Sequence, residues 1–540
     1  MEFINMQSVD RKIYTASAVL LQTLGKIGVK HIFGYPGSAV LSVYDEISKQ
    51  SDIKHYLFRH EQSAVHAAEG FARVSGECGV VLVTSGPGAS NTLTGIANAY
   101  LDGNPLVIIA GQVSNSVRGK NSFQEIDFAE IVKPCTKAVF KINSPEEIES
   151  SLIQAFLIAT SGKKGPVVVE VPKNIFSEFC EYKNLSLPVD KCISVSEHDI
   201  EIAFEILRNS KSPIVVCGGG VVHSKAFNEL SELVELIDIP VVSTMLGVGA
   251  FSQHSPNYAG MIGVYGEASA NNLLKNADTI LVLGARFNDR VLDAFDVDSL
   301  NAKNIIQVDI NSAELIKNLR SDLAVNADIK EFLCALNVKI ENSLVMEFDR
   351  NFQARRFDDF IDEKLTMSEV VKEFNKFSAH KNFVVVSEVG QHQIALIKNY
   401  EFTSPLITSG GLGAMGFGFS AGIGASIALG KFPVVVFAGD GSFQMNSQEL
   451  AVCKQYSLPV KVFVMNNSSL GMVRQTQDEK FSSRFESDLM NPDFVKLADS
   501  YGIKAIKVEN SSEIQPAFEE AFANNEPFVV EFVTSKEENV

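Results

Sequence analysis

The sequence predicts an α/β fold made of three open, doubly wound domains, each built on a parallel sheet. The chain has 540 residues, of which 46% are hydrophobic and 21% charged. That composition is ordinary for a globular protein, and the length is too great for a single hydrophobic core. Short runs rich in β-branched residues alternate with helix-like stretches, which is typical of parallel strands covered on both faces.

Three domains are expected, over residues 8–180, 197–342 and 366–534, with a polar segment at 181–199 and a charged one at 346–364 between them. The runs that predict their strands lie at 53–58, 79–84, 105–110 and 166–171, at 213–217, 239–243, 279–283 and 305–308, and at 383–387, 433–438, 460–465 and 527–532.

Charge and cysteine content narrow the class of protein. Lys and Arg number 47 and Asp and Glu 65, a net charge of −18, so without a local basic stripe the chain is not expected to bind nucleic acid. Seven cysteines without a C-x-x-C pair argue against a disulfide framework or zinc ribbon and for a reducing compartment. The N-terminus shows no apolar signal region. We therefore expect a cytoplasmic protein.

Residues 402–430 carry no charge and are long enough to cross a membrane. Eight glycines fall between Gly410 and Gly430, however, and bulky apolar residues are few, so membrane insertion is not expected. We interpret the segment as a buried loop and helix whose backbone comes close to another part of the protein.

The most informative passage runs from 434 to 472. A first apolar run ends at a Gly-Asp-Gly triplet that contains Asp440, and Asn446 with Glu449 three residues later predicts a helix with a capping box. A second apolar run ends at an Asn pair that contains Asn467. A strand–helix–strand unit places its strands parallel, so Asp440 and Asn467 are expected together at the carboxyl ends, where open α/β sheets bind ligands.

The chemistry of Asp440 and Asn467 suits Mg²⁺. Carboxylate and amide oxygens are hard ligands, and Mg²⁺ keeps the rest of its shell for water and substrate phosphates. Gly439 and Gly441 allow a tight turn and close approach to a diphosphate. The spacing from Gly-Asp-Gly to Asn-Asn resembles the signature of thiamine diphosphate enzymes.

Thiamine chemistry also requires a buried carboxyl that hydrogen-bonds the cofactor's pyrimidine ring. Glu61 follows the strand-like run 53–58 and opens a helix of small residues. Taken alone, a glutamate at a helix start is better explained as a partner of the helix dipole. The surrounding string, RHEQSAVHAAEGFAR (59–73), resembles the glutamate motif of thiamine enzymes and favours the catalytic role.

Motifs along nearly the whole chain together resemble the catalytic large subunit of acetohydroxyacid (acetolactate) synthase. They are FGYPGSAVLSVYDE (33–46), RHEQSAVHAAEGFAR (59–73), SGPGASN (85–91), SFQEIDFAEIVKPCTK (122–137), GPVVVEVPKN (165–174), TMLGVGAF (244–251), GARFNDRV (284–291), VGQHQ (389–393), GGLGAMGFG (410–418), GDGSFQMNSQEL (439–450) and LGMVRQ (470–475). The resemblance implies a pyrimidine-binding N-terminal domain, a central FAD-binding-like domain and a C-terminal domain that binds the diphosphate and Mg²⁺.

The same resemblance implies roles for individual residues at the thiamine site. Glu61 activates the cofactor, while Asp440, Asn467 and the backbone carbonyl of Ser469 hold Mg²⁺. The other implied cofactor contacts are Met415, which supports its bent form, Gln391 and His392 at the diphosphate, and Gly37, Gly439, Gly441, Ser442, Gly471 and Met472.

Four further residues are implied at the substrates. Phe123, Gln124 and Lys173 line the site from a partner subunit, so a homodimer or homotetramer is expected. Arg290 grips the carboxylate of the second 2-keto acid, which suits a guanidinium fork; the alternative is a surface ion pair with Asp289 or Asp293. In the central domain, the residues implied at FAD are Gly218, Gly219, Arg286, Asp309 and Asp328.

The implied reaction decarboxylates pyruvate and joins the two-carbon unit to a second 2-keto acid, pyruvate or 2-ketobutyrate, giving 2-acetolactate for branched-chain amino acid biosynthesis. The resemblance leaves open whether a regulatory small subunit attaches. Several positions depart from the family pattern: Thr476 stands for a Trp, Val264-Tyr265 for Met-His, Ile394-Ala395 for Met-Trp, and Lys163 for an Arg near FAD. The chain also ends short of the family's mobile C-terminal tail.

Most of these departures cluster around the pocket for the acceptor substrate, so other functions stay open. The first is a carboligase with a different carbonyl acceptor, because a smaller side chain at Thr476 reshapes the pocket. A pyruvate oxidase or decarboxylase is the second, although the adjacent His pair of decarboxylases is missing. The third is a non-catalytic homologue that only binds the cofactor.

Overall fold

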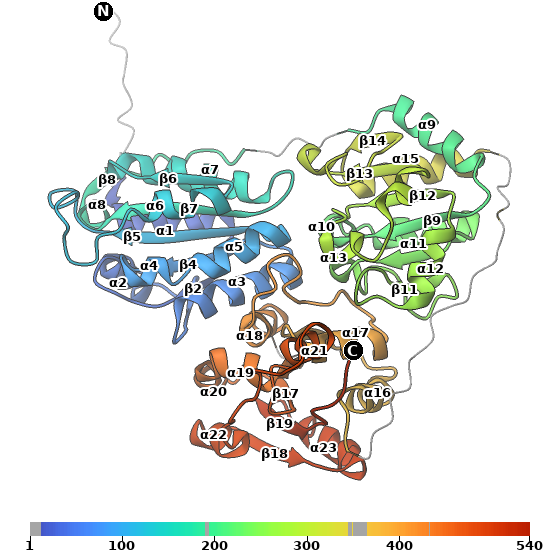
Figure 1. The fold of residues 1–540 in the computed structure, drawn as a ribbon. Helices are drawn as coiled ribbons and strands as arrows, with labels where there is room; N and C mark the ends of the chain where they lie inside the picture. Colours follow the sequence, from blue (N-terminus) through green and yellow to red (C-terminus); the bar gives the residue numbers. More distant parts are fainter. Residues whose placement is uncertain (1–11, 189–193, 344–347, 349–363, 431) are drawn as a thin grey trace, which may run out of the picture. The chain divides into compact units, whose positions relative to one another are not determined.

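The computed structural model describes residues 12–188, 194–343, 348, 364–430 and 432–540. The chain divides into two compact units, 1–190 and 191–540. The first contains one six-stranded sheet, and the second contains a six-stranded and a five-stranded sheet (Figure 1). All strand pairs within these three sheets are parallel, which confirms the predicted fold class.

The sheet of the first unit is covered by helices on both faces. Ile32 on β2 (His31–Gly34) joins a core cluster with α1 (Ala16–Ile27), whereas Phe33 points to the other face and packs on Phe71 of α3 (Glu61–Ser75), ring centroids 5.6 Å apart. The strand order is β3 (Lys54–Leu57), β2, β4 (Gly79–Val83), β5 (Leu106–Gln112), β7 (Pro166–Pro172) and β6 (Ala138–Lys141). The other helices are α2 (Leu41–Ser48), α4 (Pro87–Ser90), α5 (Leu93–Asp102), α6 (Phe128–Val132), α7 (Ile148–Thr160) and α8 (Lys173–Ser177).

The six-stranded sheet of the second unit has the order β11 (Tyr258–Met261), β10 (Val241–Ser243), β9 (Pro213–Cys217), β12 (Thr279–Leu283), β13 (Asn304–Asp309) and β14 (Leu323–Asn326). Alternating strand residues enter two separate core clusters, one on each face. Its helices are α9 (Glu197–Arg208), α10 (Gly219–Ser224), α11 (Phe227–Ile237), α12 (Ala268–Asn276), α13 (Asp289–Leu292), α14 (Val297–Asn301) and α15 (Ile329–Glu341).

The five-stranded sheet has the order β15 (Val384–Ser387), β16 (Val434–Gly439), β17 (Val460–Asn466), β19 (Phe528–Val533) and β18 (Lys504–Val508). An aromatic core centred on Phe374 fills one face. Its helices are α16 (Met367–Ser378), α17 (Gln391–Asn399), α18 (Phe417–Leu429), α19 (Asp440–Asn446), α20 (Leu450–Tyr456), α21 (Gly471–Lys480), α22 (Phe494–Ser500) and α23 (Ile514–Ala521).

The uncharged segment 402–430 is a loop followed by α18; the helix is buried as expected, whereas the loop is exposed at Thr403, Leu412 and Gly413. A Cβ at Gly418 would lie 2.6 Å from the backbone nitrogen of Glu388, and one at Gly422 would lie 2.4 Å from the side chain of Val436. The glycines therefore let the helix lie directly against β15 and β16. Among the described residues, no helix is both long and apolar enough to cross a membrane.

Two sequence predictions fail in detail. The polar segment 181–199 is not a linker at its ends, because Glu181 pairs with Ile13 between β8 (Phe179–Glu181) and β1 (Ile13–Thr15), and α9 already begins at Glu197. Within the three sheets, strands β2, β6, β11, β14 and β18 were not predicted, and all but β2 lie at sheet edges. Partial exposure explains β6, β14 and β18, whereas β11 is fully buried. The domain boundaries stay predictions; residue 8 and most of 346–364 lie outside the described residues.

Candidate active site

The Gly-Asp-Gly and Asn-Asn motifs meet at one edge of the five-stranded sheet. β16 ends at Gly439 and β17 at Asn466, and Gly439 pairs with Met465 across the two parallel strands. Asp440 and Asn467 therefore follow the carboxyl ends of neighbouring strands, as the spacing predicts, and both are buried.

The Asp440 carboxylate is fixed at both oxygens. Oδ1 accepts from the backbone N–H of Gly441 at 3.0 Å, and Oδ2 accepts from Asn491 Nδ2 at 2.7 Å. Burial raises the pKa of Asp440 to about 6, against the effect of these hydrogen bonds. At neutral pH the side chain is thus a buried anion, and none of its hydrogen-bond partners among the described residues is a cationic side chain. A bound divalent cation would balance this charge.

A tight turn follows Asn467. Ser468 has φ +53°, and the backbone N–H of Ser469 donates to Asn467 Oδ1 at 3.1 Å. Backbone hydrogen bonds from Leu489 to Ser468 (2.9 Å) and from Leu470 to Ser487 (2.8 Å) hold the turn against the loop 481–493. The Ser469 side chain is also tied down, donating to the Ser487 carbonyl at 2.9 Å. The turn is therefore rigid where the sequence places two of the three predicted metal ligands.

Gln391 and His392 begin α17, after the neighbouring strand β15. Gln391 Oε1 accepts from Asn467 Nδ2 at 3.4 Å, which joins it to the predicted metal site. His392 is buried, its Nε2 has no partner among the described residues, and burial lowers its pKa to about 4. The neutral ring hydrogen-bonds the backbone of Glu388, and the unpartnered Nε2 leaves one hydrogen-bonding position open at this edge.

Glycines occupy positions at the carboxyl ends of these strands where neighbouring side chains leave little room for a Cβ. A Cβ at Gly471 would lie 1.8 Å from Gln391 Oε1, and one at Gly439 would lie 2.9 Å from His392 Nδ1. A Cβ at Gly441 would meet Leu470 at 3.1 Å and the terminal methyl of Met415 at 3.7 Å. Ser442 closes the turn by hydrogen-bonding the Gly439 backbone, and Met472 is the second residue of α21. The donor set and the crowding both fit a diphosphate–Mg²⁺ group.

In the first unit, the predicted residues follow the carboxyl ends of four parallel strands. Gly37 lies beyond β2, Glu61 beyond β3, Gln124 beyond β5, and Lys173 directly after β7. Glu61 is 9% exposed, and its Oε2 accepts from Asn91 Nδ2 at 2.9 Å, while a Cβ at Gly88 would lie 3.3 Å from Oε1. Oε2 is thus held by a hydrogen bond, and Oε1 lies beside Gly88, which has no side chain to block it. This arrangement suits a carboxyl group that hydrogen-bonds a flat ring.

The residues predicted to reach a partner's site are prominent on the unit's surface. Phe123 is 88% exposed, and Lys173 is exposed. Gln124 has φ +62° and packs on Gly86, whose Cβ would lie 2.8 Å from the Gln124 Cβ. The loop that carries them is anchored by Arg118, which donates to the buried Glu170 at 2.5 Å.

The residues implied at FAD also share a sheet edge: Asp309 ends β13, and the others follow the carboxyl ends of β9, β12 and β14. Gly218 permits close packing, since its Cβ would lie 2.2 Å from the Gly284 carbonyl. Asp309 Oδ1 accepts from the Asn311 N–H at 2.8 Å, and Asp328 caps α15 by accepting from the Lys330 N–H at 2.9 Å. These residues therefore have structural roles besides the one implied; Gly219 opens α10, and Arg286 follows β12.

Arg290 lies on α13, with its side chain 68% exposed. Its Nε is 3.8 Å from Asp289 Oδ2, which matches the alternative of a surface ion pair. A pair so exposed contributes about 0–1 kcal/mol to stability, so the guanidinium stays available to a substrate carboxylate.

The predicted capping box at Asn446 and Glu449 is wrong. α19 begins at Asp440, directly after the strand, and ends at Asn446. The Asn446 side chain instead donates to the carbonyl of Gly416 at 2.6 Å, so it ties α19 to the start of α18.

Three site residues were missed by sequence reasoning. Asn491 contacts Asp440, as described above. The buried Glu388 accepts from the backbone N–H groups of Gly416 and Phe419 at 2.9 Å each, which fixes the loop that carries Met415. Glu538 is the third: its carbonyl accepts from Gln391 Nε2 at 3.1 Å and from Arg474 at 2.9 Å. None has a local motif, because each acts on residues far away in the sequence.

Replacing Glu538 by Gln is expected to lower the apparent Tm. The buried carboxylate accepts from Met367 N at 2.6 Å, Ser368 N at 3.0 Å and Ser368 Oγ at 2.7 Å, and so caps α16. Loss of charge and of acceptor capacity should cost about 1–3 kcal/mol. Thermal unfolding checks this, with the exposed neighbour Glu537→Gln as the control, for which a change near zero is expected. Equal Tm values for the two variants would contradict the capping role.

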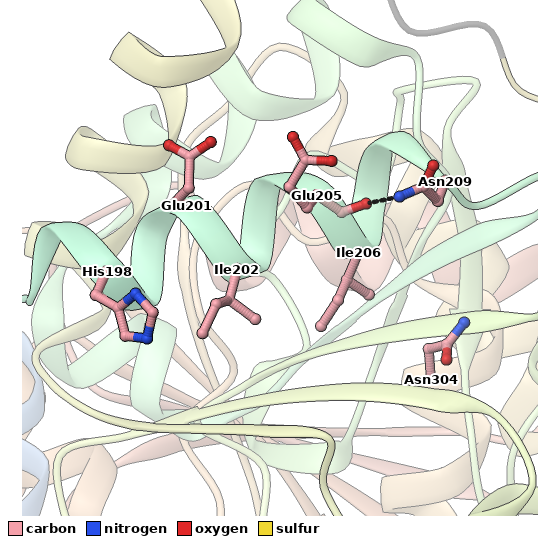
Figure 2. A pocket seen from close by; sticks show the side chains of 7 residues that line it. All are labelled: His198, Glu201, Ile202, Glu205, Ile206, Asn209 and Asn304. Carbon is pink, nitrogen blue, oxygen red and sulfur yellow. Dashed lines mark hydrogen bonds between the residues drawn. The ribbon is translucent and has the colours of Figure 1, made fainter.

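A separate hollow of about 400 Å³ lies beside α9 (Figure 2). Figure 2 shows Ile202 and Ile206 on the same side of the helix as His198, while Glu201 and Glu205 point away. Asn304 on its rim begins β13, so the hollow lies at the amino end of that strand. None of the predicted site residues lines it, and it is not the candidate site.

Comparison with known proteins shows similarity in every part of the chain. Residues 14–131 match the model "Thiamine pyrophosphate enzyme, N-terminal TPP binding domain", 200–336 match its central domain, and 388–532 match its C-terminal TPP binding domain. Three relatives are similar over most of their length. They are the acetolactate synthase large subunit of Cyanidium caldarium (39% identical, 98% of this chain, 94% of the relative), the acetolactate synthase isozyme 3 large subunit of Escherichia coli K12 (37%, 98%, 96%), and the probable acetolactate synthase large subunit of Methanocaldococcus jannaschii (38%, 95%, 91%).

Proposed function

The chain belongs to the acetolactate synthase large-subunit family of thiamine pyrophosphate enzymes, and we propose that it decarboxylates pyruvate and joins the two-carbon unit to a second 2-keto acid, which gives 2-acetolactate and CO₂ when that acid is also pyruvate. The observation that supports this most directly is the similarity to acetolactate synthases over 91–96% of their length. The names of these relatives support the synthase rather than an oxidase, a decarboxylase or a carboligase with another acceptor.

We propose that the residues act as follows. Thiamine diphosphate, when bound, would supply the carbon nucleophile needed for decarboxylation of one keto acid and for bond formation with the other. Glu61, held by Asn91, exchanges a proton with the pyrimidine ring. Asp440, Asn467 and the Ser469 carbonyl would hold Mg²⁺. Gln391, His392 and the glycines of this edge position the diphosphate, and Met415 supports the rings.

Substrate binding is proposed to involve Arg290, whose exposed guanidinium would pair with the carboxylate of the acceptor. Phe123, Gln124 and Lys173 would complete the site of another copy of the chain, so the active form is a homodimer or homotetramer. Because the relatives are called large subunits, a small subunit is a proposed further partner. Light scattering of the purified protein, alone and with a candidate small subunit, tests both statements.

FAD is proposed at the carboxyl ends of the central sheet, at Gly218, Gly219, Arg286, Asp309 and Asp328. The support is their shared position at the edge where open α/β sheets take nucleotides. Flavin absorbance of the purified protein tests this directly, and a colourless protein that gains no flavin on incubation with FAD would contradict it.

Product analysis tests the reaction. The protein is incubated with pyruvate, thiamine diphosphate and Mg²⁺, and we expect 2-acetolactate. Acetaldehyde would indicate a decarboxylase, peroxide or acetyl phosphate an oxidase, and the absence of turnover a non-catalytic homologue.

Replacing Thr476 by Trp is expected to shift the acceptor preference from pyruvate towards 2-ketobutyrate. Thr476 lies on α21, one turn beyond Met472, and its hydroxyl donates to the Met472 carbonyl at 2.9 Å. A large apolar surface here would favour the extra methylene of 2-ketobutyrate by about 1–3 kcal/mol. Competition between the two acids measures the shift, and an unchanged product ratio would place Thr476 outside the acceptor pocket.

A further inference from the structure

A chain of carboxamides lies behind the Asp440 carboxylate and leads to a buried glutamate. Asn491 Nδ2 donates to Asp440 Oδ2 at 2.7 Å and to Asn466 Oδ1 at 2.8 Å. Asn466 Nδ2 in turn donates to Glu531 Oε1 at 2.7 Å. We propose that Asn491 is a positioning residue for the metal ligand Asp440, and that Asn466 and Glu531 hold Asn491 in place.

The direction of each bond in this chain is set by its neighbours. Gln444 Nε2 donates to Asn491 Oδ1 at 2.8 Å, which leaves Nδ2 of Asn491 for its two acceptors. Asn466 Oδ1 also accepts from the backbone N–H of Ser468 at 3.1 Å, so the Asn466 amide nitrogen must face Glu531. A reversed amide at either position would set donor against donor. The network therefore has one orientation, and it ends in a donor to Asp440.

These hydrogen bonds contribute strongly because most of the groups that they join are buried. Asp440 is 3% exposed, Asn466 8% and Glu531 2%, so bulk water does not substitute for a lost partner at these positions. With Gly441 on Oδ1 and Asn491 on Oδ2, the plane of the carboxylate is fixed before any cation binds. Hydrogen-bonded partners of metal ligands typically change metal affinity 10–100-fold when removed.

Asn491 reaches the site through an irregular loop, 481–493, between α21 and α22. The loop is tied to the turn after Asn467 by the Leu489–Ser468 and Leu470–Ser487 backbone bonds. The same loop thus hydrogen-bonds the Asn467–Ser469 turn and places the side-chain amide of Asn491 beside Asp440. It therefore contacts predicted metal ligands that follow two different strands, β16 and β17.

The inference rests on the proposed Mg²⁺ site, and metal binding tests it without reference to turnover. Mn²⁺ is titrated into the protein at saturating thiamine diphosphate, and free Mn²⁺ is followed by its paramagnetic resonance signal. Asn491→Ala is expected to weaken Mn²⁺ binding roughly 10–100-fold. The control is Asn375→Ala in the same domain, where Asn375 exchanges two hydrogen bonds with Glu401 away from the site, and wild-type Mn²⁺ affinity is expected.

The outcomes are distinguishable. A folded Asn491→Ala variant that binds Mn²⁺ like the wild type overturns the positioning role and leaves the proposed function intact. If Asn491→Ala does not fold, Glu531→Met decides: it keeps the approximate size but removes the acceptor for Asn466, so a smaller loss of affinity is expected and an unchanged affinity overturns the role. If the wild type itself binds no Mn²⁺ with the cofactor, the proposed metal site fails together with this inference.

Discussion

Replacing Glu61 by Gln is expected to lower turnover with pyruvate roughly 10²–10⁴-fold, the range of a lost proton transfer. The side chain is 9% exposed at the start of α3, and its Oε2 accepts from Asn91 Nδ2 at 2.9 Å. A carboxamide oxygen can keep that hydrogen bond, so the fold and most of the affinity for thiamine diphosphate should persist. What the amide cannot do is exchange a proton with the pyrimidine ring.

Steady-state rates and cofactor binding by calorimetry, measured on the same preparation, separate these effects. A matched control is Glu69→Gln on the same helix. Glu69 is buried and accepts from Asn98 and Asn104 at 2.9 Å each, two turns further along and away from the strand ends. It should lose stability but keep the turnover of the folded fraction. A Glu61→Gln variant that retains more than about a tenth of wild-type activity would show that another group moves the proton.

The sequence could predict the strands that position this site because the signals are local. The apolar runs before Asp440 and Asn467 end in Gly and Asn residues that turn the chain, and parallel pairing then follows from the strand–helix–strand order. Edge strands such as β18 escaped detection since their residues are partly exposed and alternate in polarity. The capping box predicted at Asn446 and Glu449 was wrong for another reason: α19 begins at Asp440, directly after β16, so Asn446 ends this helix and does not begin the next one with a side-chain cap.

Contacts made by tertiary folding could not be predicted from local pattern. Asn491 lies in a polar loop, where an asparagine is typical of a turn. Folding nevertheless brings its Nδ2 to 2.7 Å from Oδ2 of Asp440, which lies 51 positions earlier. Glu538 likewise meets Met367 across 171 positions. In both cases a buried polar group is hydrogen-bonded by a residue from a distant part of the chain. A single sequence does not indicate which distant amide or carboxylate will be that partner.

Replacing Asp440 by Asn is expected to weaken Mg²⁺ binding, and with it the Mg²⁺-dependent binding of thiamine diphosphate, by roughly 10²- to 4 × 10³-fold. Removing one partner of a buried charge pair costs about 3–5 kcal/mol, and 1.4 kcal/mol corresponds to about tenfold in affinity. Asp440 is 3% exposed, and burial raises its pKa to about 6, so at pH 7.5 it is an ionised group whose charge the cation would balance. Asn keeps the size but contributes no charge.

Calorimetric titration of thiamine diphosphate at fixed Mg²⁺ concentrations measures the effect and distinguishes it from unfolding. Asp499→Asn is the control in the same domain: Asp499 is exposed near the end of α22, outside the loop that positions Asp440, so cofactor binding should not change. If Asp440→Asn required no more Mg²⁺ than the wild type, the ion would be held by other oxygens. The carboxyl ends of β16 and β17 would then position the diphosphate through backbone groups alone, and Asp440 would be a buried acid retained for the turn it makes with Gly441.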